Sequence, residues 1–106
     1  MFDLRWSASE KKTARSAYEQ ARESVLAELV TEFKARAAAV ATPSDMWAVE
    51  DYLRQRRQEL DEIFDYRYSQ LPLVFARLIR EGHLDEARLV GLSEEKLEII
   101  RRLLTR

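Results

Sequence analysis

Cysteine is absent from the 106 residues of this chain. Disulfide bonds, thiol catalysis and thiolate metal sites are therefore excluded, and we expect a cytoplasmic protein rather than a small secreted domain. Glycine and proline are scarce, with two of each, so few residues favour tight turns or interrupt helices. An excess of charge of one sign is also lacking, because 18 basic residues face 19 acidic ones. This balance provides no broad surface for nucleic acid or for an anionic membrane.

Patterns that carry enzyme chemistry are missing as well. There is no glycine-rich phosphate loop, no Gly-x-Ser-x-Gly and no His-Glu-x-x-His. His83, the one histidine, follows Gly82 without a metal-binding or catalytic neighbour, and we predict a solvated turn residue. No run of about 18 apolar residues occurs and the N-terminus turns polar at once, so neither a membrane span nor a signal peptide is expected. The sequence predicts no catalytic residue, no metal, no cofactor and no enzyme.

The segment 9–42 contains neither glycine nor proline and is predicted to form one long helix. Apolar and small side chains recur along it at spacings of three and four. At about 1.5 Å per residue this helix would be about 50 Å long, which exceeds the width of a compact domain of this size. Part of its apolar stripe should therefore contact a second copy of the chain. We place Val25, Leu29, Val30 and Phe33 in that dimer interface.

A second helix is predicted to follow the first and to pack against it as a hairpin. Pro43 should end the first helix, while Ser44 and Asp45 are good N-cap residues for the second. The apolar pattern then continues through Leu53 to about Tyr68, and we assign Leu53 to the dimer interface too.

The remaining residues predict short helices separated by single prolines and glycines. Pro72 marks a break near the start of an apolar helix at residues 73–79, which Gly82 should end. A helical turn at residues 85–90 and a last helix capped by Ser93 follow. The expected fold is all-α, with a long helical hairpin stem at about 8–69 and a small C-terminal helical head at about 70–106. It forms a single domain, residues 1–106, and assembles as an elongated homodimer.

Trp47 lies on the polar face of the predicted second helix. At about 100° per residue it projects roughly 130° away from the apolar side, next to Asp51 and Arg54, with Arg57 at the margin. Two interpretations are open. The indole could pack over neighbouring side chains or on the first helix, or it could anchor a protein interface in which the charges set orientation. We favour the interface and also place Trp47 near the second copy of the chain.

A longer motif begins at Trp47. It continues as Asp51-Tyr52-Leu53, Arg57, Glu59-Leu60-Asp61, Asp65, Arg67, Ser69, Val74-Phe75-Ala76 and Arg80-Glu81-Gly82. This pattern resembles the fluorescence recovery protein family of cyanobacteria and its bacterial relatives.

The resemblance implies a dimeric helical regulator that binds the photoactivated orange carotenoid protein. Such a protein speeds the return to the dark state and helps to detach its partner from the phycobilisome, so a cyanobacterial member would work near thylakoid-attached phycobilisomes. The resemblance places Trp47, Asp51 and Arg57 in the functional patch. The full set of predicted partner-binding residues is Trp47, Glu50, Asp51, Arg54, Arg57, Leu73 and Phe75.

Three residues depart from the family pattern. Glu50 stands where a histidine is found, Leu73 where an aromatic residue is found and Ile99 where a lysine is found. An alternative hypothesis is therefore a diverged dimeric adaptor with a different protein partner or carotenoid-binding domain. A third, an unrelated DNA-binding or antitoxin-like dimer, needs a basic surface. The densest basic segment, residues 54–57, is flanked by acidic residues at helical ion-pair spacings, which disfavours nucleic-acid binding.

Overall fold

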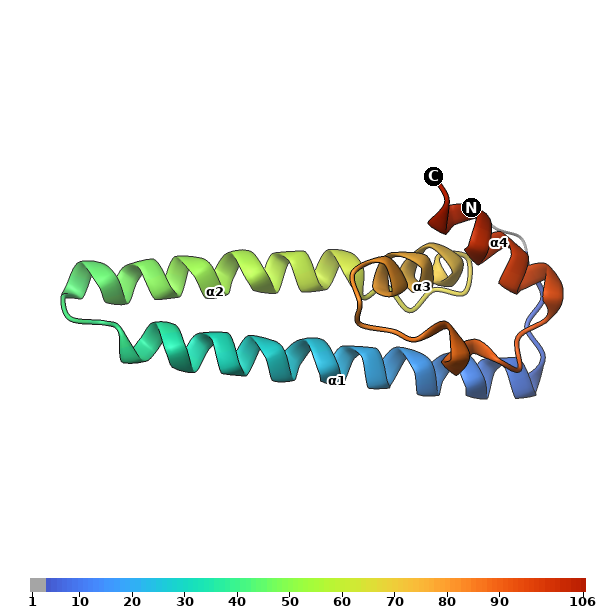
Figure 1. Ribbon diagram of the computed structural model, residues 1–106, viewed down its shortest axis with the longest axis horizontal. Coiled ribbons are helices and arrows are strands. Elements are labelled where there is room, and N and C mark those ends of the chain that lie inside the picture. Colours follow the sequence, from blue (N-terminus) through green and yellow to red (C-terminus); the bar gives the residue numbers. More distant parts are fainter. Residues whose placement is uncertain (1–3) are drawn as a thin grey trace.

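The computed structural model describes residues 4–106, so residues 1–3 of the predicted domain lie outside it. The elements are α1 (Ala8–Ala38), α2 (Pro43–Ile63), α3 (Leu71–Arg80), the 3-10 helix η1 (Glu86–Leu89) and α4 (Glu94–Leu104). In Figure 1, α1 and α2 lie antiparallel as a long stem, while α3, η1 and α4 gather at one end as a head. The dimensions are 53 × 24 × 22 Å. The predicted all-α stem and head are confirmed.

A capping box starts α1. The Ser7 side chain accepts a hydrogen bond from the backbone N–H of Glu10 at 3.1 Å, and the Ser7 N–H donates to the Glu10 carboxylate at 3.0 Å. These two bonds satisfy backbone donors that have no partner within the helix. The first turn of α1 is therefore fixed by residues that lie next to one another in the sequence.

The turn between the two stem helices differs from the prediction. Thr42, rather than Ser44 or Asp45, is the N-cap of α2, and Pro43 is the first helical residue rather than the end of α1. The Thr42 side chain and Asp45 form a second capping box, with hydrogen bonds of 3.1 and 3.2 Å. Proline suits this position because the first helical N–H needs no partner, and the residue before it favours an extended backbone. Helix α1 ends at Ala38, earlier than predicted, and Ala39 is its C-cap.

Helix α2 ends at Ile63, several residues before the predicted end near Tyr68. Phe64 leaves the helical region with φ −90° and ψ 80°. The departure brings Phe64 and Tyr66 edge-on to the ring of Tyr18 in α1, with centroid separations of 5.4 and 4.7 Å. Burial of these rings against α1 stabilises the non-helical connection to the head.

The hydrophobic core occupies the head and the half of the stem beside it. The fully buried large side chains include Leu71, Phe75 and Leu78 of α3, together with Leu89 and Ile100. Helix α1 contributes mainly small residues, Ala14, Ala17 and Ala21, which allow close packing. By contrast, no residue from 26 to 62 is buried. The outer half of the stem therefore has no core of its own.

Short-range signals set the ends of the head helices much as predicted. Gly82 has φ +81° and ends α3, with its N–H bonded to Ile79 O at 3.1 Å and the His83 N–H bonded to Leu78 O at 2.8 Å. The α3 helix is longer than the predicted 73–79 because Pro72 fits within its first turn. Ser93 caps α4, as predicted. None of the described helices is long and apolar enough to cross a bilayer.

Candidate functional site

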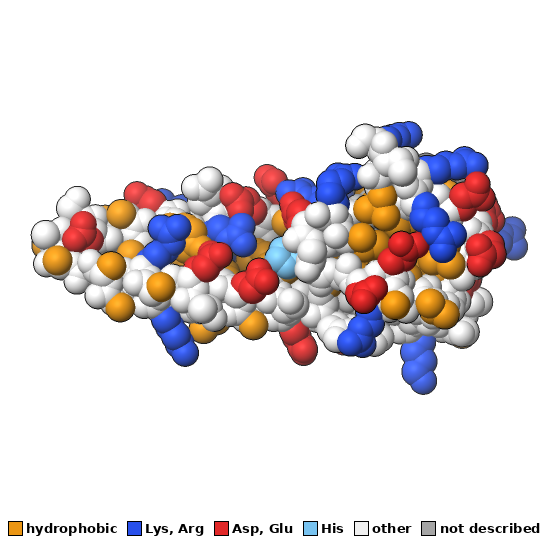
Figure 2. All heavy atoms as spheres, viewed as in Figure 1, with side chains coloured by type: hydrophobic (Ala, Val, Ile, Leu, Met, Phe, Trp, Pro, Cys, Tyr) orange, Lys and Arg blue, Asp and Glu red, His pale blue; other side chains and the backbone are white. Residues whose placement is uncertain are grey.

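The predicted recognition residues on α2 lie on the outer half of the stem. Trp47 is 56% exposed, and Asp51, Arg54 and Arg57 are exposed as well. Trp47, Asp51 and Arg54 follow one another at spacings of four and three, so they share one face of the helix. We call Trp47, Asp51, Arg54 and Arg57 the α2 patch. Figure 2 shows hydrophobic side chains interspersed with charged ones along the stem, a mixed surface of this kind.

Of the three charged residues in the α2 patch, only Arg54 forms an ion pair within the described residues. Arg54 Nη2 lies 2.7 Å from Glu50 Oε1, and both side chains are more than half exposed. Exposed pairs of this kind contribute little to stability, typically about 0–1 kcal/mol. Within residues 4–106, Asp51 and Arg57 make no ion pair, so each keeps a charge that a partner can complement.

Tyr52 joins α2 to α1, a contact that the periodicity of the sequence did not reveal. Its hydroxyl donates a hydrogen bond to the carboxylate of Glu32, and Arg36 Cζ lies 3.7 Å from the centre of its ring. The hydrogen bond to the Glu32 carboxylate is the main reason that the pKa of Tyr52 is raised above its ordinary value. We call Glu32, Arg36 and Tyr52 the Tyr52 cluster.

The predicted dimer residues divide into buried and accessible ones. Val25 is 3% exposed within a single chain, so we correct its assignment: it packs inside its own chain and is not available to a second copy. Leu29 and Leu53 are half-buried. Val30 and Phe33 are among the large hydrophobic residues that remain exposed. Because α1 passes the head before it reaches the outer stem, only the later part of its stripe is left uncovered.

The two head residues predicted to bind a partner also differ from each other. Phe75 is completely buried in the core, so we correct its assignment from partner contact to core residue. Leu73 is half-buried and lines a shallow hollow whose other lining residues include Arg77, Arg80 and Arg106. Ile99 packs against the core from its edge.

His83 is not the solvated turn residue that we predicted. Its side chain is mostly covered, and Nδ1 lies 3.7 Å from Glu28 Oε2 of α1. The turn after α3 folds back onto the stem, which removes the imidazole from solvent. Nδ1 is buried and makes no hydrogen bond.

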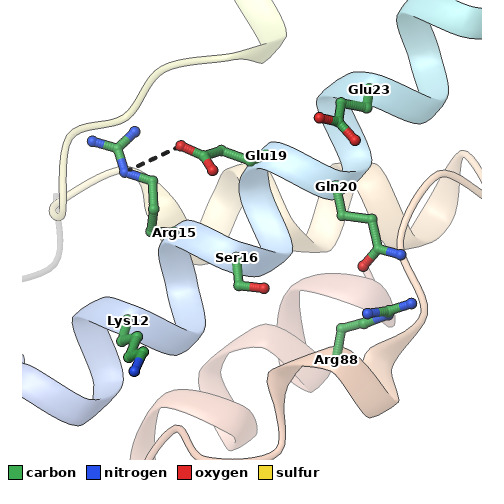
Figure 3. Close-up of a pocket in the computed structure, with 7 residues that line it drawn as sticks. All are labelled: Lys12, Arg15, Ser16, Glu19, Gln20, Glu23 and Arg88. Carbon is green, nitrogen blue, oxygen red and sulfur yellow. Dashed lines mark ion pairs between the residues drawn. The ribbon is translucent and has the colours of Figure 1, made fainter.

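A separate open pocket lies where η1 meets α1, and its lining does not suggest catalysis. Figure 3 shows Gln20 of α1 pointing toward Arg88 of η1, with Lys12 further along the helix. Arg15 Nε is 3.7 Å from Glu19 Oε1, so the charges here are partly paired. In the described part of the chain, no group of three or more His, Cys, Asp or Glu side chains could hold a metal ion.

Comparisons with known proteins agree with this architecture. The family model for the photoprotection regulator fluorescence recovery protein matches residues 6–104. The fluorescence recovery protein of Synechocystis is 31% identical over 98 residues, which cover 92% of this chain and 90% of that protein.

Solved structures give the same result. The fluorescence recovery protein of Fremyella diplosiphon is similar to this chain with a TM-score of 0.90 at 33% identity. The Synechocystis structure also has a TM-score of 0.90, at 29% identity. Each comparison covers 96% of this chain and 100% of the other. Sequence and fold therefore agree over almost the whole length, and the chain belongs to the fluorescence recovery protein family, whose members regulate photoprotection and are not enzymes.

Proposed function

We propose that this protein binds the photoactivated orange carotenoid protein, accelerates its return to the dark state and helps to detach it from the phycobilisome. The proposal rests on membership of the family and on one observation, the exposed Trp47 beside unpaired Asp51 and Arg57. Tryptophan and arginine are frequent anchors of binding energy in protein interfaces, and adjacent charges favour one orientation of the partner. The proposed site of action is the cytoplasm, close to the phycobilisomes.

The proposed activity needs no reactive group. A protein can speed a conformational return if it binds the separated domains of its partner in an arrangement that is closer to the transition state than to either end state. The α2 patch suits this task because it lies on a long helix, where the relative positions of its side chains are set by helical geometry.

We further propose that the protein works as a homodimer through the outer stem. No residue from 26 to 62 is buried, whereas Val30 and Phe33 on α1 are exposed. A second copy that covered these side chains would give the outer stem the buried apolar surface that it lacks. Trp47 and Leu53 of α2 lie in the same half of the stem and belong to the proposed interface.

A diverged partner is the second candidate, and Glu50 favours it. Its carboxylate, which is held by Arg54 at 2.7 Å, adds negative charge beside the α2 patch at the position where the resemblance expects a histidine. Leu73 likewise offers less apolar surface than an aromatic side chain at the hollow of the head. The two residues therefore change the charge and the apolar area of the surface that a partner would contact.

The test is the dark recovery of the orange carotenoid protein. Photoactivated protein is mixed with increasing amounts of this chain, and the red-to-orange return is timed by absorbance. We expect the rate to rise and to saturate. An unchanged rate at a large excess would rule out the proposed activity, and affinity capture from the source organism would then test the diverged partner.

A further inference from the structure

Within a single chain, the outer stem has few contacts that can fix how α2 is rotated relative to α1. In folded proteins, helices are held in place mainly by the burial of an apolar face. Here every residue from 26 to 62 is exposed or half-buried, and the only buried residue of α2 is Ile63 at its end. Within one chain, the rotation of α2 in the outer stem therefore depends strongly on individual side-chain contacts with α1.

Tyr52 makes two such contacts with α1. Its hydroxyl donates to the Glu32 carboxylate, and its ring lies against the guanidinium group of Arg36, one turn further along α1, at 3.7 Å. A charged acceptor strengthens a hydrogen bond, and the guanidinium is attracted to the face of the ring. Within residues 4–106, this is the one side-chain hydrogen bond that joins α1 to α2.

The direction of Tyr52 determines where the α2 patch faces. At about 100° per residue, Asp51 is displaced from Tyr52 by about 100° around the helix and Trp47 by about 140°. When Tyr52 is held against α1, Asp51 points to the side of the stem and Trp47 points away from α1. Both residues are exposed, in agreement with these directions. A rotation of α2 would move both of them together.

We infer that Tyr52 is a positioning residue, which through Glu32 and Arg36 holds α2 in the rotation that presents Trp47 and Asp51 to the partner. The inference rests on the proposed function, since it assumes that the α2 patch is the recognition surface. The inference gives a role to Tyr52, which is not part of the α2 patch but controls the direction of that patch through its contacts with α1.

The first measurement is the concentration of this protein that gives half of the maximal recovery rate. Tyr52→Phe removes only the hydroxyl, and Glu32→Ala removes only its acceptor. Each should raise the half-saturating concentration about three- to ten-fold and leave the maximal rate unchanged. The double variant should be no worse than either single variant, because both remove one interaction. Glu32→Gln, which keeps an acceptor oxygen, should restore most of the affinity.

The matched control is Glu23→Ala, which removes an exposed carboxylate from the same helix outside the Tyr52 cluster. It should leave the half-saturating concentration unchanged. If Tyr52→Phe behaves like wild type, or if the effects of Tyr52→Phe and Glu32→Ala simply add, the positioning role is wrong. If the variants lower both the maximal recovery rate and the melting temperature, the protein is generally destabilised, and this result would also overturn the positioning role.

The second measurement needs no partner. Because the chain has no cysteine, the variant Lys34→Cys with Gln55→Cys provides two unique sites for spin labels, one on each stem helix. Labelled protein is diluted with unlabelled protein, and the distribution of distances between the two labels is measured by double electron–electron resonance. We expect a narrow distribution that broadens with Tyr52→Phe. If the widths are equal, the cluster does not order the stem, whether or not wild-type protein accelerates recovery. Failure of wild-type protein in the recovery assay alone would instead count against the proposed function.

Discussion

Lys96 Nζ lies 3.0 Å from Glu10 Oε2 and 2.6 Å from the backbone carbonyl oxygen of Arg5. The two charged side chains are only 5% and 12% exposed. Glu10 also accepts a hydrogen bond from the N–H of Ser93 at 2.9 Å, and the ring of Trp6 lies 5.0 Å from the ammonium group. Together these contacts connect the first turn of α1 to the first turn of α4, and so they join the N-terminal segment to the last helix.

Glu10→Gln should destabilise the protein strongly. The substitution leaves the buried ammonium group of Lys96 without its counter-charge, a change that typically costs about 3–5 kcal/mol. Urea unfolding measures the loss. The control is Glu19→Gln, because Glu19 forms an exposed pair with Arg15 and should cost less than about 1 kcal/mol. Equal losses in the two variants would show that the buried pair contributes nothing special.

Stability should also fall in acid, with Glu10 as a main cause. Hydrogen bonding from the Ser7 backbone, opposed by burial and reinforced by Lys96, lowers the pKa of Glu10 to about 2. The native pKa is thus below the unfolded value, so the stabilisation is complete above about pH 4.5 and is lost as the pH falls toward 2. Unfolding measured at several pH values should show a loss on the order of 3 kcal/mol that Glu10→Gln lacks. Identical pH slopes would contradict this assignment.

Gly91→Ala should destabilise more than Gly82→Ala. Both glycines have positive φ, but an added Cβ at Gly91 would lie 2.9 Å from Thr13 Oγ1, whereas Gly82 has no atom within 4 Å. We expect losses of about 2–4 kcal/mol at Gly91 and about 1 kcal/mol at Gly82, measured by thermal or urea unfolding. Thr13→Ala in the Gly91→Ala background should recover part of the loss, and no recovery would show that backbone strain alone is responsible.

Phe33→Asp and Val30→Asp should weaken the proposed dimer. Each places a charge on the exposed apolar part of α1, where burial against a second copy would be costly. Sedimentation at micromolar concentration should show a shift toward the monomer mass. Val90→Asp is the control, because Val90 is 77% exposed but belongs to the head. If the outer-stem variants keep the same mass as wild type and wild type is dimeric, the interface lies elsewhere.

Trp47→Ala should impair partner binding and leave the fold intact. The indole is largely exposed, so its removal takes little from the core, while the loss of an interface anchor costs about 1–3 kcal/mol, or roughly 5- to 150-fold in affinity. Titration of the recovery rate measures the change, and circular dichroism checks the helices. Met46→Ala removes a neighbouring exposed apolar side chain and provides the comparison. Similar effects of both variants would argue against a specific role for the indole.

Local signals in the sequence were sufficient for much of the fold. Scarce glycine and proline, the three- and four-residue periodicity, and the caps at Gly82 and Ser93 act within a few residues, so the all-α class and the breaks in the head followed directly. The exposed position of Trp47 also followed from helical geometry, because its angle to the apolar side depends only on spacing.

Other features depended on residues far apart in the chain. Val25 and Phe33 belong to one periodic stripe, yet only Val25 is buried, because the head covers the first part of α1 and not the rest. Phe75 is in the core, His83 lies against Glu28, and α2 ends early so that aromatic rings can pack on Tyr18.

The sequence by itself thus determined where helices form and which side of each is apolar, because capping and periodicity are short-range effects. Only the tertiary structure decided which part of each apolar side is covered. It also buried Lys96 next to Glu10 and brought Tyr52 into contact with Glu32. These contacts join segments from different helices. Their energies depend on burial and distance in the folded chain, which no local pattern of residue types records.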